Sequence, residues 1–318
     1  MNLKIVALAG GVGGAKLAHG LTQILPPESL VIIVNTGDDF EHLGLYISPD
    51  LDTVCYTLAG LANPLTGWGR IDESWNAFNN IAKLGGETWF QLGDSDLGTH
   101  LLRSNRLQKG DSLSAITRDF CHAWGIEHRI IPMTDDPMPT IVDTVEMGEL
   151  PFQEYFVHQR CKPTVKGFRF EGAESARPAE GVEEAFNEAD AVVICPSNPW
   201  VSIDPILRVT KLKPTRVSSP ASKRKLIVAI SPIIGGKAVK GPAAKMYREL
   251  GIMPSALAVA KHYGELLDGF VFDQKDAGLE NEINNLGIKT LICDTLMKDE
   301  KGRRRVAKDV LEFIDTLL

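Results

Sequence analysis

The cysteines of this sequence show none of the pairings that link a fold covalently or bind zinc. Five are present and no two form a C-x-x-C pair; they are Cys55, Cys121, Cys161, Cys195 and Cys293. An odd number of scattered thiols is typical of buried cysteines in a reducing compartment. The apolar run at residues 3–9 is too short to cross a membrane. It leads into glycines and not into the cleavage site of a signal peptide. We therefore expect a cytoplasmic protein that does not enter a membrane.

Positive charge is scarce as well, because the formal net charge is -7 at pH 7. Affinity for nucleic-acid phosphates comes mainly from clustered Lys and Arg, so no nucleic-acid partner is expected. The one basic run, Arg303, Arg304 and Arg305, is predicted to be the solvated face of the last helix. The motifs G-x-S-x-G and H-E-x-x-H are absent, which leaves hydrolysis by a serine or zinc route without support.

Short runs rich in valine and isoleucine alternate with helical patterns, which is typical of a parallel sheet covered on both faces. Strands are expected at residues 3–9, 30–35, 191–195, 226–230, 269–273 and 288–293. Helices are expected at residues 15–25, 181–188, 242–250, 255–267 and 303–317, with a polar loop at 217–224. The predicted fold class is α/β, a doubly wound, mostly parallel, Rossmann-like sheet within one domain, 1–318.

The middle of the chain departs from this alternation. Residues 51–124 are mostly helical, with Trp68, Trp75 and Trp89 among polar residues. Residues 129–170 contain the short β-like runs HRIIP, TIVDTVE, EYFVH and VKGFRF. We expect about residues 51–170 to form a helical and β-containing cap insertion over the carboxyl edge of the sheet, where ligands of open α/β sheets bind.

The first predicted strand ends in the glycine-rich turn GGVGGAK, whose candidate phosphate-binding residues are Gly10, Gly11, Gly13, Gly14 and Lys16. Backbone N–H groups of such a turn can approach an anion at the start of a helix. The turn is not a Walker A loop, because Ala15 precedes the lysine and no Ser or Thr follows it. It also lacks the last glycine of the dinucleotide fingerprint. Phosphate binding and a tight structural turn both remain open on this motif alone.

Carboxylates gather after the second predicted strand. NTGDD contributes Asp38 and Asp39, and SPDLDT contributes Asp50 and Asp52. An acidic residue here can hold a ribose hydroxyl, and Asp50 or Asp52 can cap the following helix. Several carboxylates at one sheet edge repel each other unless a cation compensates, and Mg²⁺ prefers such oxygen ligands. The cluster therefore favours a magnesium site.

Three later turns carry further candidates. LGDSDLGTH provides Asp94, Ser95 and His100, with Arg103 one turn later, and these residues either cap a helix or contact a phosphate or carboxylate of a substrate. The small polar turns PSNP and SPIIGG suit a nucleotide at the carboxyl edge of the sheet. Their candidate residues are Ser197, Asn198, Ser231, Gly235 and Gly236.

In their order, GGVGGAK, NTGDDFEHLGLYISPDLDT, LGDSDLGTH, PSNPWVSI and SPIIGGKAVKGPA resemble the 2-phospho-L-lactate transferase family of coenzyme F-420 biosynthesis. The likeness runs from residue 3 to about residue 294, and GWGRIDESW is similar to the form in bacterial members. The resemblance implies a Mg-dependent phosphotransferase of the substituted-phosphate class. It would move a phospholactyl, phosphoenolpyruvyl or phosphoglyceryl group from a guanosine diphosphate conjugate to 7,8-didemethyl-8-hydroxy-5-deazariboflavin, releasing GMP.

The resemblance also implies residue roles and a homodimer. Magnesium would be held by Asp38, Asp50 and Asp52, with Asp50 also close to the deazaflavin. The position of Ser95 is often basic in the family, so Arg103 is expected to supply the missing contact. On the residues' own chemistry, Asp52 is the predicted acceptor of the alcohol proton and the tryptophans are expected to stack on the flat ring.

Two other functions stay open at this point. The early glycine turn and acidic strand end suggest an NAD-dependent oxidoreductase, although the missing glycine and the surplus of aspartate argue against it. A nucleotide-sugar-sensing regulatory protein of related fold is the second alternative. PDLDT together with GDSD favours catalysis over sensing.

Overall fold

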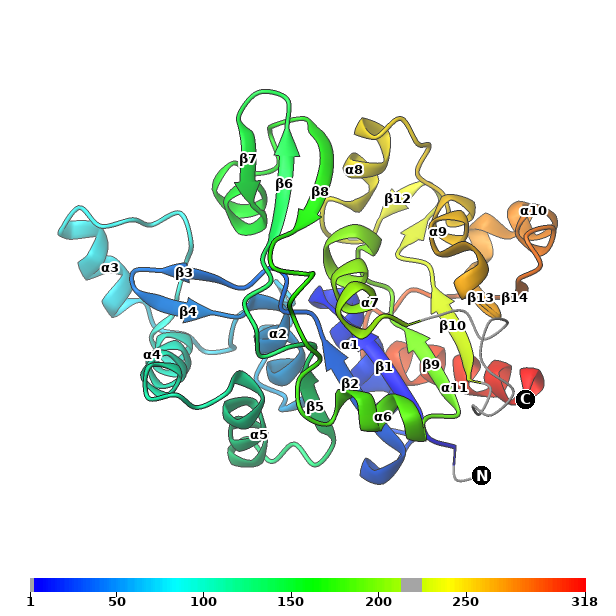
Figure 1. Cartoon of the computed structure of the whole chain (residues 1–318), viewed down its shortest axis with the longest axis horizontal. Coiled ribbons are helices and arrows are strands. Elements are labelled where there is room, and N and C mark those ends of the chain that lie inside the picture. Colours follow the sequence, from blue (N-terminus) through cyan, green and yellow to red (C-terminus); the bar gives the residue numbers. More distant parts are fainter. Residues whose placement is uncertain (1–2, 213–224) are drawn as a thin grey trace.

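The computed structural model describes residues 3–212 and 225–318, and it is built around one seven-stranded sheet (Figure 1). All neighbouring strands run parallel, in the order β14-β13-β10-β9-β1-β2-β5. The strands are β1 (Ile5–Ala9), β2 (Leu30–Val34), β5 (Arg129–Pro132), β9 (Ala191–Ile194), β10 (Leu226–Ile230), β13 (Gly269–Asp273) and β14 (Lys289–Cys293). The predicted doubly wound α/β class is confirmed.

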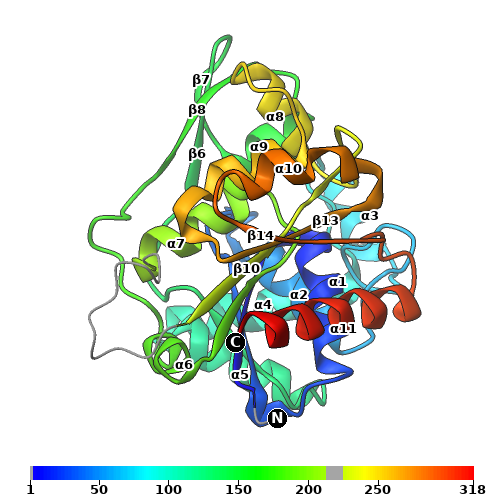
Figure 2. The ribbon, with the colours of Figure 1, turned by 90° about the vertical axis from the view of Figure 1, so that its right-hand side faces the viewer.

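The inner strands of this sheet are buried on both faces, which requires them to be continuously apolar. In β1, Val6 and Leu8 enter one core cluster while Ile5, Ala7 and Ala9 enter the other. The second cluster also takes residues from α1 (Gly11–Thr22), α2 (Pro49–Leu58), α5 (Leu113–Ala123) and α11 (Glu300–Leu317). The first takes residues from α6 (Val182–Glu188), α7 (Asp204–Thr210), α8 (Ala243–Glu249), α9 (Ala256–Tyr263) and α10 (Glu280–Asn284). Figure 2 shows these two helical layers on opposite sides of the sheet.

The predicted strands and helices of the sheet region are present, with shifted ends. The helix expected from residue 15 begins at Gly11, so part of the glycine turn is itself helical. The helix expected at residues 255–267 ends at Tyr263, before Gly264 with a φ of 52°. The polar loop expected at residues 217–224 lies outside the described residues.

The basic run of α11 differs from the prediction of a solvated face, because only Arg304 is exposed. Arg305 donates to the carbonyl oxygen of Asp294 and pairs with its carboxylate at 2.9 Å. This contact fastens the loop that leads from β14 toward the ligand side of the sheet.

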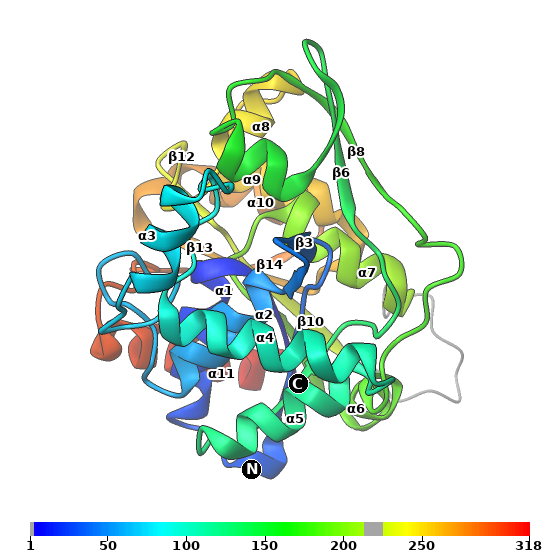
Figure 3. The ribbon, with the colours of Figure 1, turned by 90° about the vertical axis from the view of Figure 1, so that its left-hand side faces the viewer.

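The cap insertion has two pieces, since β5 pairs with β2 inside the central sheet and separates them. The first piece contains the hairpin β3 (Phe40–His42) and β4 (Leu45–Ile47), followed by α2, α3 (Asn76–Lys83), α4 (Asp94–Gln108) and α5. The second is an antiparallel sheet of β6 (Thr140–Thr144), β7 (Gly148–Pro151) and β8 (Val165–Phe170). Figure 3 shows α4 and the β6–β8 sheet as separate parts of the cap.

One β-like run of the cap was predicted wrongly. EYFVH forms a π-helix, η2 (Glu154–His158), because Tyr155 turns into the core of the cap while its neighbours stay half-buried or exposed. Within residues 3–212 and 225–318, no helix is both long enough and apolar enough to span a membrane.

Candidate active site

A cavity of about 660 Å³ opens at the carboxyl edge of the central sheet, beneath the cap. Its walls come from the turns after β1, β2, β9 and β10, from α2 and from the η2 segment. The volume is typical of a small-molecule site. The predicted site residues that line it are Gly10, Gly11, Gly13, Lys16, Asp38, Asp50, Asp52, His100, Ser197, Asn198 and Ser231.

The glycine-rich turn brings the N-terminus of α1 to the cavity. A Cβ atom added at Gly10 would lie 2.6 Å from Oδ2 of Asp50, and one at Gly13 would collide with the carbonyl oxygen of Pro196. The glycines are therefore required for the close approach of α1 to the acidic segment and to the PSNP turn. The first backbone N–H groups of α1 lie at the cavity, where the helix dipole favours an anion.

Two serines of the predicted site hold their own turns in place. Oγ of Ser197 donates to the carbonyl oxygen of Gly10 at 2.8 Å and accepts from its N–H at 3.2 Å. The same Oγ leaves no room for a side chain at Gly14, which is buried behind the cavity wall. Ser231 bonds both the N–H and the carbonyl oxygen of Ile233. These hydroxyls shape the wall that a ligand would meet.

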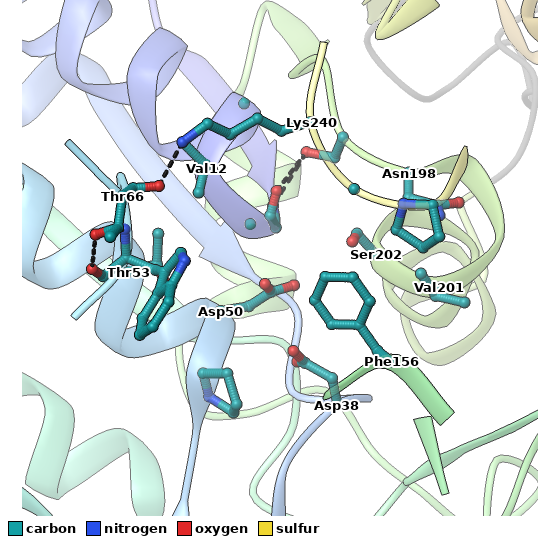
Figure 4. A pocket seen from close by; sticks show the side chains of 18 of the residues that line it. Val12, Asp38, Asp50, Thr53, Thr66, Phe156, Asn198, Val201, Ser202 and Lys240 are labelled. Atoms are coloured by element: carbon teal, nitrogen blue, oxygen red, sulfur yellow. Dashed lines mark hydrogen bonds between the residues drawn. The ribbon is translucent and has the colours of Figure 1, made fainter. Parts of the chain in front are cut away.

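Asp38 and Asp50 share one amide group. Nδ2 of Asn35 donates to Oδ1 of Asp38 at 3.2 Å and to Oδ2 of Asp50 at 2.9 Å, and all three side chains are buried. Nε2 of Gln153, from the cap, donates to the other oxygen of Asp38 at 2.9 Å. Figure 4 shows the two carboxylates next to each other, with Phe156 alongside.

The electrostatics of this acidic pair favour a bound cation. Burial, followed by the charges of Asp50 and Asp39, raises the pKa of Asp38 well above its usual range. Burial also raises the pKa of Asp50 to about 6, although the hydrogen bond from Asn35 opposes the shift. Two buried carboxylates that repel each other are stabilised in their charged forms by a cation between them.

The residues fit magnesium as it is usually bound in proteins. The described residues contain no group of three or more His, Cys, Asp or Glu side chains arranged to hold a metal. Mg²⁺ is, however, commonly held by one or two carboxylates together with substrate phosphates and water. Asp38 and Asp50 beside the N-terminus of α1 provide that set of oxygen donors next to a phosphate position.

Asp52 has a different partner. Both of its oxygens accept hydrogen bonds from the buried guanidinium of Arg103, one of them at 3.0 Å. Nδ1 of His100 lies 3.2 Å from the same guanidinium, and its Nε2 lies 3.3 Å from Oδ1 of Asp96. Tyr56 donates to that oxygen at 2.7 Å. This network compensates the charge of Asp52, which argues against Asp52 as a metal ligand, and it keeps Arg103 behind the cavity wall.

Other predicted site residues lie away from the cavity. The carboxylate of Asp94 accepts from the hydroxyl of Ser74 at 2.6 Å and from the N–H of Ala77 at 2.9 Å, and these and further hydrogen bonds lower its pKa to about 2. Asp94 thus caps α3. Ser95 bonds Glu73 through its backbone N–H. Two glycines, Gly235 and Gly236, belong to the turn between β11 (Ile233–Ile234) and β12 (Lys237–Ala238), outside the lining.

An aromatic wall faces the acidic pair from the cap. Of the tryptophans singled out in the sequence, Trp68 and Trp89 line the cavity and Trp75 does not. Phe90 and Phe156 line it as well, although nothing in their local pattern distinguishes them from core residues. Trp89 stacks on His158 with 5.1 Å between ring centroids and 11° between planes, and it lies 5.8 Å from Phe90. A flat apolar ring can stack on such a surface.

The fold and cavity define an α/β ligand-binding protein of the doubly wound class. Residues 5–311 match the family described as 2-phospho-L-lactate transferase CofD. The chain belongs to this family, and therefore to a family of transferases. Because the family and the relatives below bear transferase names, the oxidoreductase alternative is not carried forward.

Relatives match over nearly the whole chain. A phosphoenolpyruvate transferase of Streptomyces griseus is 41% identical and covers 98% of this chain and 99% of its own length. A 2-phospho-L-lactate transferase of Methanosarcina acetivorans is 38% identical and covers 98% of this chain and 100% of its own length. The crystal structure of a UPF0052-family protein from Bacillus halodurans has a TM-score of 0.62 at 15% identity, covering 97% of this chain and 99% of that chain. This last likeness bears on the fold alone.

Proposed function

We propose that this protein transfers a phosphorylated three-carbon acid from its guanosine diphosphate conjugate to the ribityl alcohol of 7,8-didemethyl-8-hydroxy-5-deazariboflavin, with release of GMP, in the biosynthesis of coenzyme F-420. One observation carries the proposal. Asp38 and Asp50 share the amide of Asn35 directly beside the N-terminus of α1, so carboxylates that suit a cation lie next to backbone N–H groups that suit an anion. A nucleoside diphosphate bound with Mg²⁺ requires that pairing.

The donor would bind along the carboxyl edge of the sheet. The N–H groups at the start of α1 and the ammonium of Lys16 are the groups of this wall that suit the diphosphate. Nζ of Lys16 is held by the carbonyl oxygen of Met297 at 3.0 Å, which fixes its charge in the wall. The turns that carry Ser197 and Asn198 continue the same edge and suit the nucleoside part.

The acceptor would lie against the aromatic wall. Trp89 already stacks on His158 and makes an edge contact with Phe90, so less side-chain freedom is lost when a flat deazaflavin ring packs on them. Asp50 lines the same cavity next to Phe156 of this wall, and its carboxylate lies against Gly10, so we expect the two substrates to meet at the acidic pair.

Displacement at phosphorus depends on charge neutralisation and alignment more than on covalent catalysis. Bound Mg²⁺ would supply Lewis-acid stabilisation of the phosphate charge. Asp38 and Asp50 would hold the ion, and the cap and sheet walls would align the alcohol with the phosphorus while excluding water. The alcohol oxygen would bond to phosphorus as the bond to GMP breaks, and the alcohol proton would pass to the phosphate of the departing GMP, because both oxygens of Asp52, the predicted acceptor, already accept from Arg103.

The test is a competition assay with the full-length protein. Purified protein, Mg²⁺, the deazaflavin and equal amounts of the phospholactyl, phosphoenolpyruvyl and phosphoglyceryl donors are mixed, and products are identified by mass. We expect a phosphodiester product and equimolar GMP. Tight binding of GDP without any product would favour a sensing role and contradict the proposal.

Light scattering in the same buffer tests the homodimer that the family resemblance suggests.

A further inference from the structure

The η2 segment of the cap forms the wall opposite the glycine turn. Phe156 and Val157 of this segment line the cavity, and so does Arg160, two residues beyond its end. Gln153, at its start, donates to Asp38 at 2.9 Å and so fixes the segment to the acidic pair. The segment therefore has a defined position relative to the place where we expect the phosphates.

The backbone of this wall adopts an unusual conformation at its end. Arg160 and Cys161 both have positive φ angles, 52° and 54°, although neither is glycine. A positive φ is unfavourable for a residue other than glycine and persists only where the surrounding structure holds the backbone in place. Such conformations concentrate at functional sites. Here the N–H of Cys161 donates to the carbonyl oxygen of buried Tyr155 at 2.9 Å, and the N–H of Gln159 donates to that of Glu154 at 2.9 Å. The turn that carries Arg160 is thus held by the core of the cap.

Arg160 differs from the other cationic side chains of the cavity. Lys16 donates to the carbonyl oxygen of Met297, and Lys240 donates to that of Thr66 across the cavity mouth (Figure 4). Among the described residues, Arg160 has neither a hydrogen bond nor an ion pair through its guanidinium, although it lines the same cavity. Its charge and donors are available to a ligand.

We propose that Arg160 binds the carboxylate of the three-carbon group that is transferred. The inference rests on the proposed function. The start of α1 and Lys16 already match the diphosphate on the sheet side, so a cation on the cap side complements a further anionic group of the donor. The lactyl, enolpyruvyl and glyceryl donors all carry one carboxylate there, and a guanidinium binds a carboxylate with two parallel hydrogen bonds.

This assignment has a consequence for specificity. Arg160 would require an acid in the transferred group, but it would not distinguish the three acids, because the carboxylate is common to all. Discrimination between them would depend on apolar neighbours such as Phe156 and Val157, which line the same wall.

The test compares two ligands in the full-length protein with Mg²⁺. Dissociation constants are measured for GDP, which lacks the acid, and for the phosphoenolpyruvyl donor, in wild type, Arg160→Ala, Arg160→Lys and Arg118→Ala. We expect Arg160→Ala to weaken the donor by about 10- to 100-fold, the usual effect of losing a charged hydrogen bond, and to leave GDP unchanged. Arg160→Lys should recover part of the loss. Arg118 is an exposed arginine of α5 away from the cavity, and its variant should match wild type.

Two results would overturn the assignment. Unchanged donor affinity in Arg160→Ala would remove Arg160 from the site, and equal losses for GDP and donor would make it a phosphate contact. Arg160→Lys keeps the charge and the stem, so it reports on the site even if the alanine variant folds poorly. The proposed function itself fails separately, if wild type binds donor and deazaflavin but forms no product.

Discussion

Arg103 donates from both terminal nitrogens to the two carboxylate oxygens of Asp52, and both side chains are buried. Burying one charge without the other is costly, so the pair is expected to act as a unit. We predict that Arg103→Ala lowers the free energy of unfolding by about 3–5 kcal/mol. Adding Asp52→Asn to that variant should recover part of the loss, because the orphaned charge is removed. Urea unfolding measures both, and equal stability of the single and double variants would contradict the coupling.

Asp50 is predicted to be needed for turnover and not for folding. Asp50→Asn keeps the size of the side chain but removes one of the two charges beside Asn35. We expect turnover to fall by about 100-fold or more, the scale of losing one electrostatic contact in an active site. Asp94→Asn is the matched control, since Asp94 caps α3 outside the cavity, and it should keep turnover within about twofold of wild type. Similar losses in both variants would contradict the placement of the site.

The stability of the metal-free protein is predicted to depend on the protonation of Asp50. Its pKa in the folded protein is about 6, above the usual value of 3.8, so the folded state favours the protonated form. The stabilising contribution is complete below about pH 4 and is lost as the pH rises through about 6. Unfolding curves in EDTA should show this loss, and Asp50→Asn should reduce it, leaving the part that comes from Asp38 and Asp39, whose pKa values burial also raises. Added Mg²⁺ should therefore stabilise wild type more at pH 7 than at pH 5.

Gly13 is predicted to tolerate no side chain. A methyl group there would collide with the backbone carbonyl of Pro196, which belongs to a turn that cannot yield without moving β9. We expect Gly13→Ala to destabilise the protein by about 3 kcal/mol or more, as overpacking against backbone does. Gly98→Ala is the contrasting variant, because Gly98 is exposed on α4 and a Cβ there meets nothing within 4 Å, and it should stabilise by about 0.5–1 kcal/mol. Thermal unfolding of the two variants should shift in opposite directions.

Trp89 is predicted to contribute to binding of the deazaflavin and not of the nucleotide. Trp89→Ala should raise the KM for the deazaflavin by about tenfold or more, a typical cost of losing one stacking partner. The dissociation constant of GDP should not change, since the start of α1 lies on the other wall. Trp75→Ala serves as control because Trp75 does not line the cavity. An equal effect of both variants on the deazaflavin would argue against the aromatic wall as its site.

The predictable part of this protein lies where local pattern and chain topology act together. The strands are apolar on both faces, so their positions and parallel arrangement followed from the sequence, and with them the meeting of Gly10, Asp38 and Asp50 at one sheet edge. The partner of Asp52 did not follow, because Arg103 is 51 residues away and reaches it only through the packing of α4 against β4. The role of Asp94 could not be predicted from local spacing either. Asp94 belongs to α4 but caps the start of α3, and such a contact between two helices is not visible in the sequence around Asp94.

The interruption of the cap by β5 separates the two recognition surfaces along the chain. The aromatic side chains Trp89 and Phe90 come before β5, whereas Arg160 and the η2 turn come after it. Each excursion starts and ends at a strand of the sheet, and the two meet in space where Trp89 stacks on His158. A change in the length of one excursion would leave the strands of the sheet in place but disturb the stacking of Trp89 on His158, so we expect the two parts of the cap to vary together.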